Sequence, residues 1–490
     1  MKKINLVLLC NILLLTAMNS AEARRFYVKA NATGTADGNS WATAYPNLFT
    51  TLSLTASGDE VWVAAGTYYP KTTAFSNLNA FILKSGVAIY GGFAGTETAL
   101  AQRNFTLNEC ILQGTDGSNK NMQTISAISV TATAKLDGFK VVGGKKTMII
   151  DSASPTISNC TITNSGTTTN ADFIYQTGST SAAKFQNCTI RENTGRIGFD
   201  GGVLRFIGCN ILYNQSDFLF NPLVNATLTV DRCSISGNTV TTLFSLYYSN
   251  FITNSLIVGN VCTNYLCYML TDNSNNGTSA FSNNTVAHNS IGGSEIFGAS
   301  TFNNLINNSF IGGNNNNTIR ATYGINTIIS SNVASVPKFV APASSPSDAP
   351  FNAADYDYRL QGGSALINAG DNNYAAAGTD LDNNPRVTGA NVDVGAYEFG
   401  YTATMNSIAN SVPLKIMPNP VSNICTLDLS ALDNPRSLQL SDMSGKLLLS
   451  QDIKGAVAPQ IDLSAVAAGV YTLQVITETY TTTQKVSVVH

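Results

Sequence analysis

Two cations in the middle of the chain are the residues best suited to chemistry. Lys184 and Arg205 each precede an isoleucine of a recurring phrase by six residues, so we expect them to be neighbours on one outer face, with Arg191 nearby. Such cations could neutralise the carboxylate of an acidic sugar, and one of them could be the base of a polysaccharide lyase. The alternative, which the sequence favours, is a solvated pair of like charges.

The acidic residues of the same region give little support to a hydrolase. A glycoside hydrolase needs two carboxylates that flank the scissile bond. Residues 121–340 contain nine acidic side chains, and no two of them are close in sequence. His288 is the one histidine of this region, and its position beside Asn289 in a repeated phrase favours a structural role.

One short segment has the spacing of a calcium loop. Asp380, Asp382 and Asn384 alternate along the chain, as the first ligands of such a loop do. Pro385 and Asn391 stand where glycine and glutamate are usual, so turn-forming Asx residues are the favoured interpretation. Calcium is the only cofactor that we consider, and a His/Cys metal site is not indicated.

Four tyrosines could form a platform on which a sugar ring stacks. They are Tyr247, Tyr248, Tyr265 and Tyr268. An exposed tyrosine offers rigid amphipathic area. Burial within the fold is the favoured alternative.

All of these residues are embedded in or around a repeat. Its clearest members are Cys160-Thr161-Ile162, Cys188-Thr189-Ile190, Cys209-Asn210-Ile211, Cys233-Ser234-Ile235, Ser255-Leu256-Ile257, Asn284-Thr285-Val286 and Asn304-Leu305-Ile306. An asparagine follows each: Asn164, Asn193, Asn214, Asn238, Asn260, Asn289 and Asn308. A period of 20 to 29 residues with one strand per period predicts a β-solenoid, with roughly nine to eleven coils stacked about 4.8 Å apart. Cysteine and isoleucine, two residues apart, should point inward, and the asparagines should form a column at a bend.

Composition and the first residues indicate export. Lys2 and Lys3, the apolar run from Ile4 to Leu15 and the A-x-A sequence ending at Ala23 predict a signal peptide over residues 1–23. Without it the chain carries 25 basic and 29 acidic side chains, which argues against a nucleic-acid partner. No transmembrane segment is expected in the remainder.

Eight cysteines remain after the leader, and five of them occupy the inward position of the repeat. Free, buried thiols are the favoured interpretation. A disulfide framework is the alternative, and Cys262 and Cys267 are the pair to test first.

The ends of the repeat resemble a known family. The stretch from Gly58 to Tyr68, the stretch from Gly86 to Glu97, and the segments Asp380–Arg386 and Val392–Glu398 resemble bacterial secreted proteins of the pectin-lyase-like superfamily. This resemblance implies a right-handed parallel β-helix over residues 24–400, with closing coils at 351–400. A short amphipathic helix at 46–56 is expected to cap the first coil.

The last part of the chain has a different character. After a polar linker at 401–412, residues 413–490 resemble a type A sorting domain of the type IX (Por) secretion system, through Met417-Pro418-Asn419-Pro420 and Ala468-Gly469-Val470-Tyr471. The chain departs from that pattern at His490, where Lys or Arg is common. The resemblance implies a small Ig-like β-sandwich, recognition by the secretion machinery, and a place at the surface of a Gram-negative cell or outside it.

We therefore expect an all-β, exported protein that binds glycans or adheres to surfaces without catalysis. The competing hypothesis is a polysaccharide lyase or glycoside hydrolase, which rests on the superfamily resemblance alone.

Overall fold

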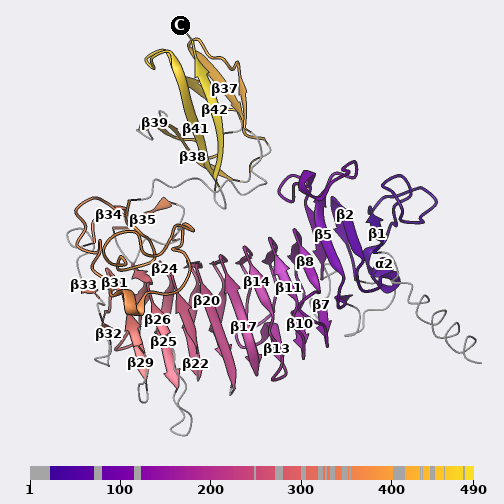
Figure 1. Ribbon diagram of the computed structural model, residues 1–490, viewed down its shortest axis with the longest axis horizontal. Helices are drawn as coiled ribbons and strands as arrows, with labels where there is room; N and C mark the ends of the chain where they lie inside the picture. Colours follow the sequence, from indigo (N-terminus) through magenta and orange to yellow (C-terminus); the bar gives the residue numbers. More distant parts are fainter. Residues whose placement is uncertain are drawn as a thin grey trace, which may run out of the picture.

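Three parallel sheets form a solenoid, and a separate antiparallel module follows it (Figure 1). The computed structural model describes residues 23–489 apart from 71–79, 115–122, 224, 248–249, 271–279, 300–304, 318–323, 326–327, 331–336, 345–350, 352–354, 401–413, 431, 433, 442–446, 457 and 478–480. The predicted signal peptide therefore lies outside the described residues, except for Ala23.

Sheet A has 12 strands. They are β1 (Arg25–Val28), β2 (Glu60–Ala64), β5 (Ala88–Phe93), β8 (Lys135–Asp137), β11 (Thr156–Ser158), β14 (Lys184–Gln186), β17 (Gly202–Ile207), β20 (Ala226–Asp231), β23 (Phe251–Thr253), β26 (Ala280–Ser282), β30 (Leu305–Asn307) and β32 (Gly324–Ile325).

Sheet B has 11 strands and contains the repeated phrase. They are β3 (Gly66–Tyr68), β6 (Cys110–Gln113), β9 (Lys140–Val142), β12 (Thr161–Thr163), β15 (Thr189–Arg191), β18 (Asn210–Leu212), β21 (Ser234–Ser236), β24 (Leu256–Val258), β27 (Thr285–Ala287), β31 (Phe310–Gly312) and β33 (Ile328–Ser330).

Sheet C has 10 strands. They are β4 (Phe81–Ile82), β7 (Gln123–Ile128), β10 (Lys146–Asp151), β13 (Asp172–Thr177), β16 (Arg196–Asp200), β19 (Gln215–Pro222), β22 (Thr239–Tyr247), β25 (Val261–Leu270), β28 (Ser290–Ile291) and β29 (Phe297–Ala299). Because β28 and β29 both pair with β25, the sheet has nine levels, and the expected all-β solenoid is confirmed.

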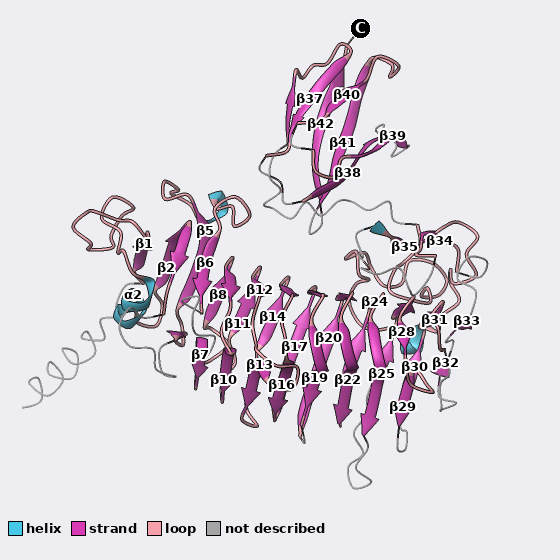
Figure 2. Cartoon of the chain, turned by 180° about the vertical axis from the view of Figure 1, so that it is seen from behind, coloured by secondary structure: helices cyan, strands magenta, loops and turns pink. Residues whose placement is uncertain are grey.

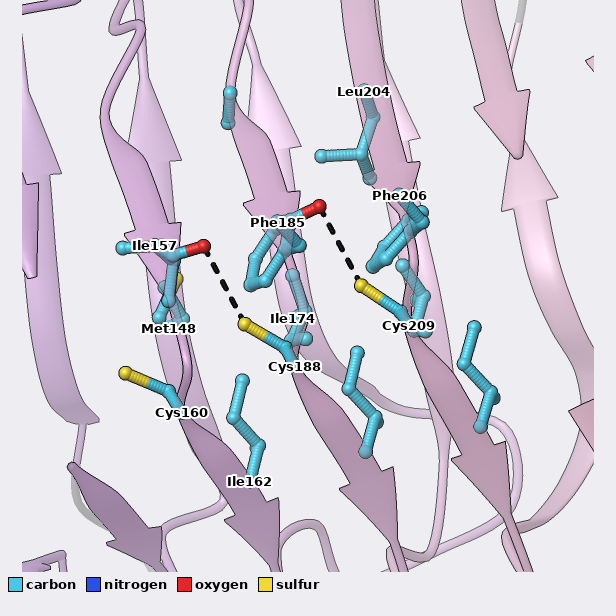
Figure 3. Close-up of a cluster of buried hydrophobic side chains, with 14 of the residues drawn as sticks. Met148, Ile157, Cys160, Ile162, Ile174, Phe185, Cys188, Leu204, Phe206 and Cys209 are labelled. Atoms are coloured by element: carbon cyan, nitrogen blue, oxygen red, sulfur yellow. Dashed lines mark hydrogen bonds between the residues drawn. The ribbon is translucent and has the colours of Figure 1, made fainter. Parts of the chain in front are cut away.

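Figure 3 shows how the repeated phrase fills the interior. Cys188 and Cys209 are fully buried, and each thiol donates to the preceding coil, to the carbonyls of Ile157 at 3.4 Å and Phe185 at 3.5 Å. Ile162 stacks in register on the next isoleucines of sheet B. Each fully buried isoleucine contributes about 1.5–3 kcal/mol, so stacking rather than any single coil stabilises the rod.

A column of buried amides closes the corner between sheets B and C. Asn238 is representative: its Nδ2 donates to the Ile211 carbonyl at 2.9 Å and to Asn260 Oδ1 at 2.8 Å, while its Oδ1 accepts from the Asn214 N–H at 2.9 Å. The ladder consists of Asn193, Asn214, Asn238, Asn260, Asn289 and Asn314.

Three positions of the predicted repeat are wrong. The first amide position is occupied by Ser165, whose N–H donates to Asn193 Oδ1, and Asn164 is exposed. The last predicted phrase, around Leu305 and Ile306, belongs to β30 of sheet A, so Asn308 is not in the ladder. Sheet B continues instead at β31, where Ile311 pairs with Val286. A Leu-Ile strand of either sheet has the same pattern, and sequence spacing alone does not separate them.

One helix covers the first coil. The helix α2 (Leu48–Leu54) begins after Asn47, whose Oδ1 accepts from the Thr50 N–H at 3.1 Å. Leu48 and Leu52 join the solenoid core, next to β1 and β4. Within the described residues no helix has the length and apolarity to cross a bilayer.

After the last coils the chain turns back over the outside of sheet B. The strands β34 (Phe339–Ala341) and β35 (Asp357–Leu360) pair antiparallel, and the 3₁₀ helix η3 (Asn372–Tyr374) follows. Phe351 and Tyr358 of this closing segment pack in one buried cluster with the outward-facing Leu256, Val258 and Phe310 of the solenoid. The closing segment is therefore an outer layer rather than further coils.

The C-terminal module is a small antiparallel sandwich (Figure 2). One sheet contains β36 (Lys415–Met417), β37 (Ile424–Asp428) and β40 (Gln460–Asp462), and the other β38 (Pro435–Ser441), β39 (Leu447–Asp452), β41 (Gly469–Thr477) and β42 (Thr481–Val488). Alternate residues such as Leu438, Leu440, Leu473 and Val475 form its buried core.

All eight cysteines after the predicted leader are free and buried, including Cys262 and Cys267 on β25. Burial raises the pKa of the Cys262 thiol to about 12, which keeps it protonated and unreactive.

Candidate functional site

A groove lies on the outer face of sheet A, and its floor is built by strand register. One column runs Arg205, Thr229, Phe251 and Ala280 on β17, β20, β23 and β26. The parallel column runs Ile207, Asp231, Thr253, Ser282 and Asn307. Because alternate residues of a strand share a face, both columns point away from the core.

The closing segment supplies one wall of this groove. Residues Asn373 to Ala377, including Tyr374, face the two columns across a cavity of about 560 Å³. The lining of the cavity is mostly apolar and includes Phe251, Ile207, Ala280 and the wall alanines. Phe251 is 38% exposed, so the wall leaves its ring open to a ligand.

Corner residues of the solenoid hold the wall in place. Asn283 Oδ1 accepts from the Ala376 N–H at 2.8 Å. Asn308 Oδ1 accepts from the Asp371 N–H at 2.8 Å, and Asn308 Nδ2 donates to the Asp371 carbonyl at 3.0 Å. Asn283 and Asn308 adopt left-handed backbone with φ of 57° and 47°, which asparagine tolerates better than most residues. The corners thus turn the coil and also anchor the returning chain.

Arg232 is the most unusual of these corners. Its Nη1 donates to Thr379 Oγ1 at 3.0 Å and to Asn383 Oδ1 at 2.8 Å, beyond the wall. Its φ is 51°, at a position where the preceding coil has Gly208. An arginine in this conformation costs about 1 kcal/mol, so its contacts with the closing segment must offset that strain.

Asp231 is the one carboxylate among the described residues that line the groove. Its Oδ1 accepts from Thr253 Oγ1 at 2.9 Å and Asn254 Nδ2 at 2.8 Å, and its Oδ2 accepts from Arg232 Nε at 2.9 Å. These partners neutralise and fix the carboxylate. The described lining therefore lacks the carboxylate pair of an acid–base glycosidase.

The predicted cations are partly brought together. Lys184 on β14 and Arg205 on β17 lie side by side, because the two strands are parallel neighbours and these residues are opposite each other in register. Within the described part of the chain neither side chain makes an ion pair. Arg205 lines the groove, and Lys184 lies one coil beyond it. Arg191 is not nearby: it belongs to β15 of sheet B, around the Asn187 corner, where it pairs with Glu192 at 2.8 Å.

The candidate calcium ligands point to different partners. Asp380 is buried and accepts from the Asn384 N–H at 2.7 Å and the Glu398 N–H at 2.9 Å. Asp382 instead forms a two-bond ion pair with Arg359, at 2.6 and 2.8 Å. Burial raises the pKa of the Asp380 carboxyl, against the effect of those donors. No group of three or more potential metal-binding side chains was found among the described residues.

His288 and the tyrosines also have clear positions. His288 is buried, and its Nδ1 lies 2.7 Å from the Tyr358 hydroxyl. Tyr265 and Tyr268 lie on β25 in sheet C, away from the groove on sheet A. Tyr248 lies outside the described residues, as does the side chain of Tyr247.

Sequence reasoning missed the aromatic part of the site, Phe251 and Tyr374. Phe251 stands two coils after Arg205 in register, but no repeated phrase marks its strand. The sequence did contain a signal for the closing segment itself. The outward residues of the later phrases change from polar to apolar, as at Leu256, which indicates that another layer covers those coils.

Comparisons with known proteins agree with this architecture. Residues 415–489 match the family of secretion-system C-terminal sorting domains. The crystal structure of pectate lyase Pel9A superposes with a TM-score of 0.50 at 17% identity, covering 77% of this chain and 97% of the other. A structure of a rhamnogalacturonan lyase gives 0.34 at 12% identity, covering 62% and 87%. No curated protein sequence matches the chain.

The likeness to Pel9A concerns the fold. The chain is a parallel β-helix protein that carries a type IX sorting domain, which directs it to the cell surface or the extracellular space.

Proposed function

We propose that this exported protein binds glycan chains without cleaving them, in the groove on sheet A, as an adhesion or glycan-capture protein. The observation that carries the proposal is the groove itself, which combines an exposed aromatic floor at Phe251, an aromatic wall at Tyr374 and a cationic end at Arg205.

Each part of the groove suits a feature of a sugar chain. Aromatic rings accept the C–H faces of sugars, and a few placed polar groups then fix orientation. Thr229, Thr253 and Ser282 supply such groups along the floor. Lys184 and Arg205 would favour a chain with a carboxylate or sulfate at that end.

A polysaccharide lyase is the second candidate, and Arg205 is the observation that favours it. A lyase needs a cation beside the substrate carboxylate and a base for the neighbouring proton. Arginine is a poor base because it stays protonated in proteins. The one carboxylate in the described lining is already engaged by three donors. Binding without cleavage therefore fits this lining better.

The test compares binding with cleavage on the same glycans. Polygalacturonate and neutral polysaccharides are titrated into the secreted protein by calorimetry, and the mixtures are assayed for unsaturated and reducing ends. We expect binding without new ends, and about tenfold weaker binding for Phe251→Ala or Tyr374→Ala. Phe399→Ala is the matched control, since Phe399 is also 38% exposed but lies outside the groove.

Two results would contradict the proposal. New chain ends that disappear in Lys184→Ala or Arg205→Ala would show a lyase. Equal affinities for Phe251→Ala and the native protein would remove the groove from recognition.

A further inference from the structure

A second aromatic surface lies on sheet C, independent of the groove. The rings of Tyr265 and Tyr268 stack with centroids 5.1 Å apart and planes inclined by 28°. Both side chains are half-buried. Within the described residues neither tyrosine hydroxyl makes a hydrogen bond, so both are available to a ligand.

A β-bulge places the two rings on one face. Residues three apart in a regular strand point in opposite directions. The N–H groups of Leu266 and Cys267 both donate to the Ile296 carbonyl, at 3.1 and 3.2 Å, so two residues of β25 oppose one of its neighbour. Leu266 and Cys267 are both fully buried, and Tyr265 and Tyr268 on either side of them point outward together.

The next strand leaves room for the pair. β25 and β29 are neighbours near the end of the solenoid (Figure 2). Gly298 of β29 pairs with Tyr268, and a Cβ there would lie 2.7 Å from the Tyr265 ring and 2.8 Å from the Tyr268 ring. The rings therefore lie over this glycine, where a larger residue would displace them.

Uncharged polar residues flank the rings. Ser245 pairs with Tyr268 on the other side, and Thr263 and Asn264 are exposed just before the bulge. This composition contrasts with the cationic end of the groove on sheet A. An acidic ligand would meet no cation at Ser245, Thr263 or Asn264.

We propose that Tyr265 and Tyr268 form a stacking site for a neutral oligosaccharide. The paired rings accept the C–H faces of its sugars, while the two hydroxyls and the Asn264 amide bond its hydroxyl groups. A purely apolar partner would leave those polar groups unpaired, which is costly. The site stands on its own observations and does not depend on the function of the groove.

The test uses neutral hexasaccharides of glucose, mannose and xylose, with trigalacturonate as the acidic probe, titrated into the full secreted protein. At least one neutral probe should bind and perturb tyrosine absorbance. Tyr265→Ala and Tyr268→Ala should each weaken it about tenfold, whereas Tyr268→Phe should stay within about threefold because stacking is kept.

Two controls keep the test specific. Tyr175→Ala removes another half-buried tyrosine of sheet C and should leave affinity unchanged. An unaltered thermal midpoint establishes that each variant is folded. The proposal is overturned if no neutral probe binds, or if a folded Tyr265→Ala/Tyr268→Ala double variant binds as tightly as the native protein.

Discussion

Replacing Asn238 by alanine tests whether the amide ladder holds the coils together. The substitution removes the acceptor of the Asn214 N–H and the side-chain donor to the Ile211 carbonyl, which also accepts within the ladder of sheet B. It also removes one donor from Asn260 Oδ1. Leaving the buried Asn214 N–H without an acceptor costs about 1–3 kcal/mol, and each of the other two lost hydrogen bonds costs about 0.5–1.5 kcal/mol, so we predict a loss of about 4 kcal/mol in the free energy of unfolding.

The assay is urea unfolding of the folded protein, followed by circular dichroism with an independent fluorescence probe. Coincident transitions are needed before a free energy is derived, since solenoids can unfold coil by coil. Asn210→Ala is the matched control, because Asn210 occupies the outward position of the phrase in the preceding coil. It should change stability by about 0.5 kcal/mol at most. A loss below about 1 kcal/mol for Asn238→Ala would refute the ladder's energetic role.

Three further predictions follow from particular contacts. Arg232→Gly should weaken glycan binding about tenfold while stability changes little, because strain is relieved as the contacts with Thr379 and Asn383 are lost; binding and thermal melts measure both. Thiol titration of the secreted protein, denatured without reductant, should find all eight cysteines free, and any blocked pair would contradict this. Burial raises the pKa of the Glu398 carboxyl to about 8, from 4.5, despite the buried Arg386 beside it. The folded state thus holds a proton that the unfolded chain loses, so this group's contribution to stability falls as pH rises from about 4.5 to 8, and Glu398→Gln should flatten the Tm profile there.

The interior of the solenoid could be predicted because its pattern is local. Cysteine and isoleucine two residues apart must share a face, and the stacked register of Ile190 and Ile211 follows from the repeat. The pairing of Lys184 with Arg205 followed from the same counting. The prediction for Arg191 was wrong because the chain turns a corner at Asn187. Lys184, before the corner, therefore lies in sheet A, whereas Arg191, after it, lies in sheet B.

The groove could not be predicted, because its two sides come from distant parts of the chain. Phe251 and Tyr374 line the same cavity, although 123 positions separate them in the sequence. Nothing local to Tyr374 indicates that it faces sheet A. Its position depends on Asn283 and Asn308, whose left-handed corners look like ordinary turn residues in the sequence.

Apolar side chains that point away from the solenoid core occur in two environments in this molecule, buried beneath another layer or exposed to solvent. On sheet B, Leu256 and Phe310 point away from the solenoid core but are 6% and 0% exposed, because the closing segment packs on them. On sheet A the outward column also changes from cationic to apolar, yet Phe251 remains 38% exposed beneath the wall. The wall is held by Arg232, Asn283 and Asn308. Because it leaves the Phe251 ring partly exposed, it gains little packing energy from that ring. Under the proposed function this open ring contacts the glycan, so its removal should affect binding and not stability.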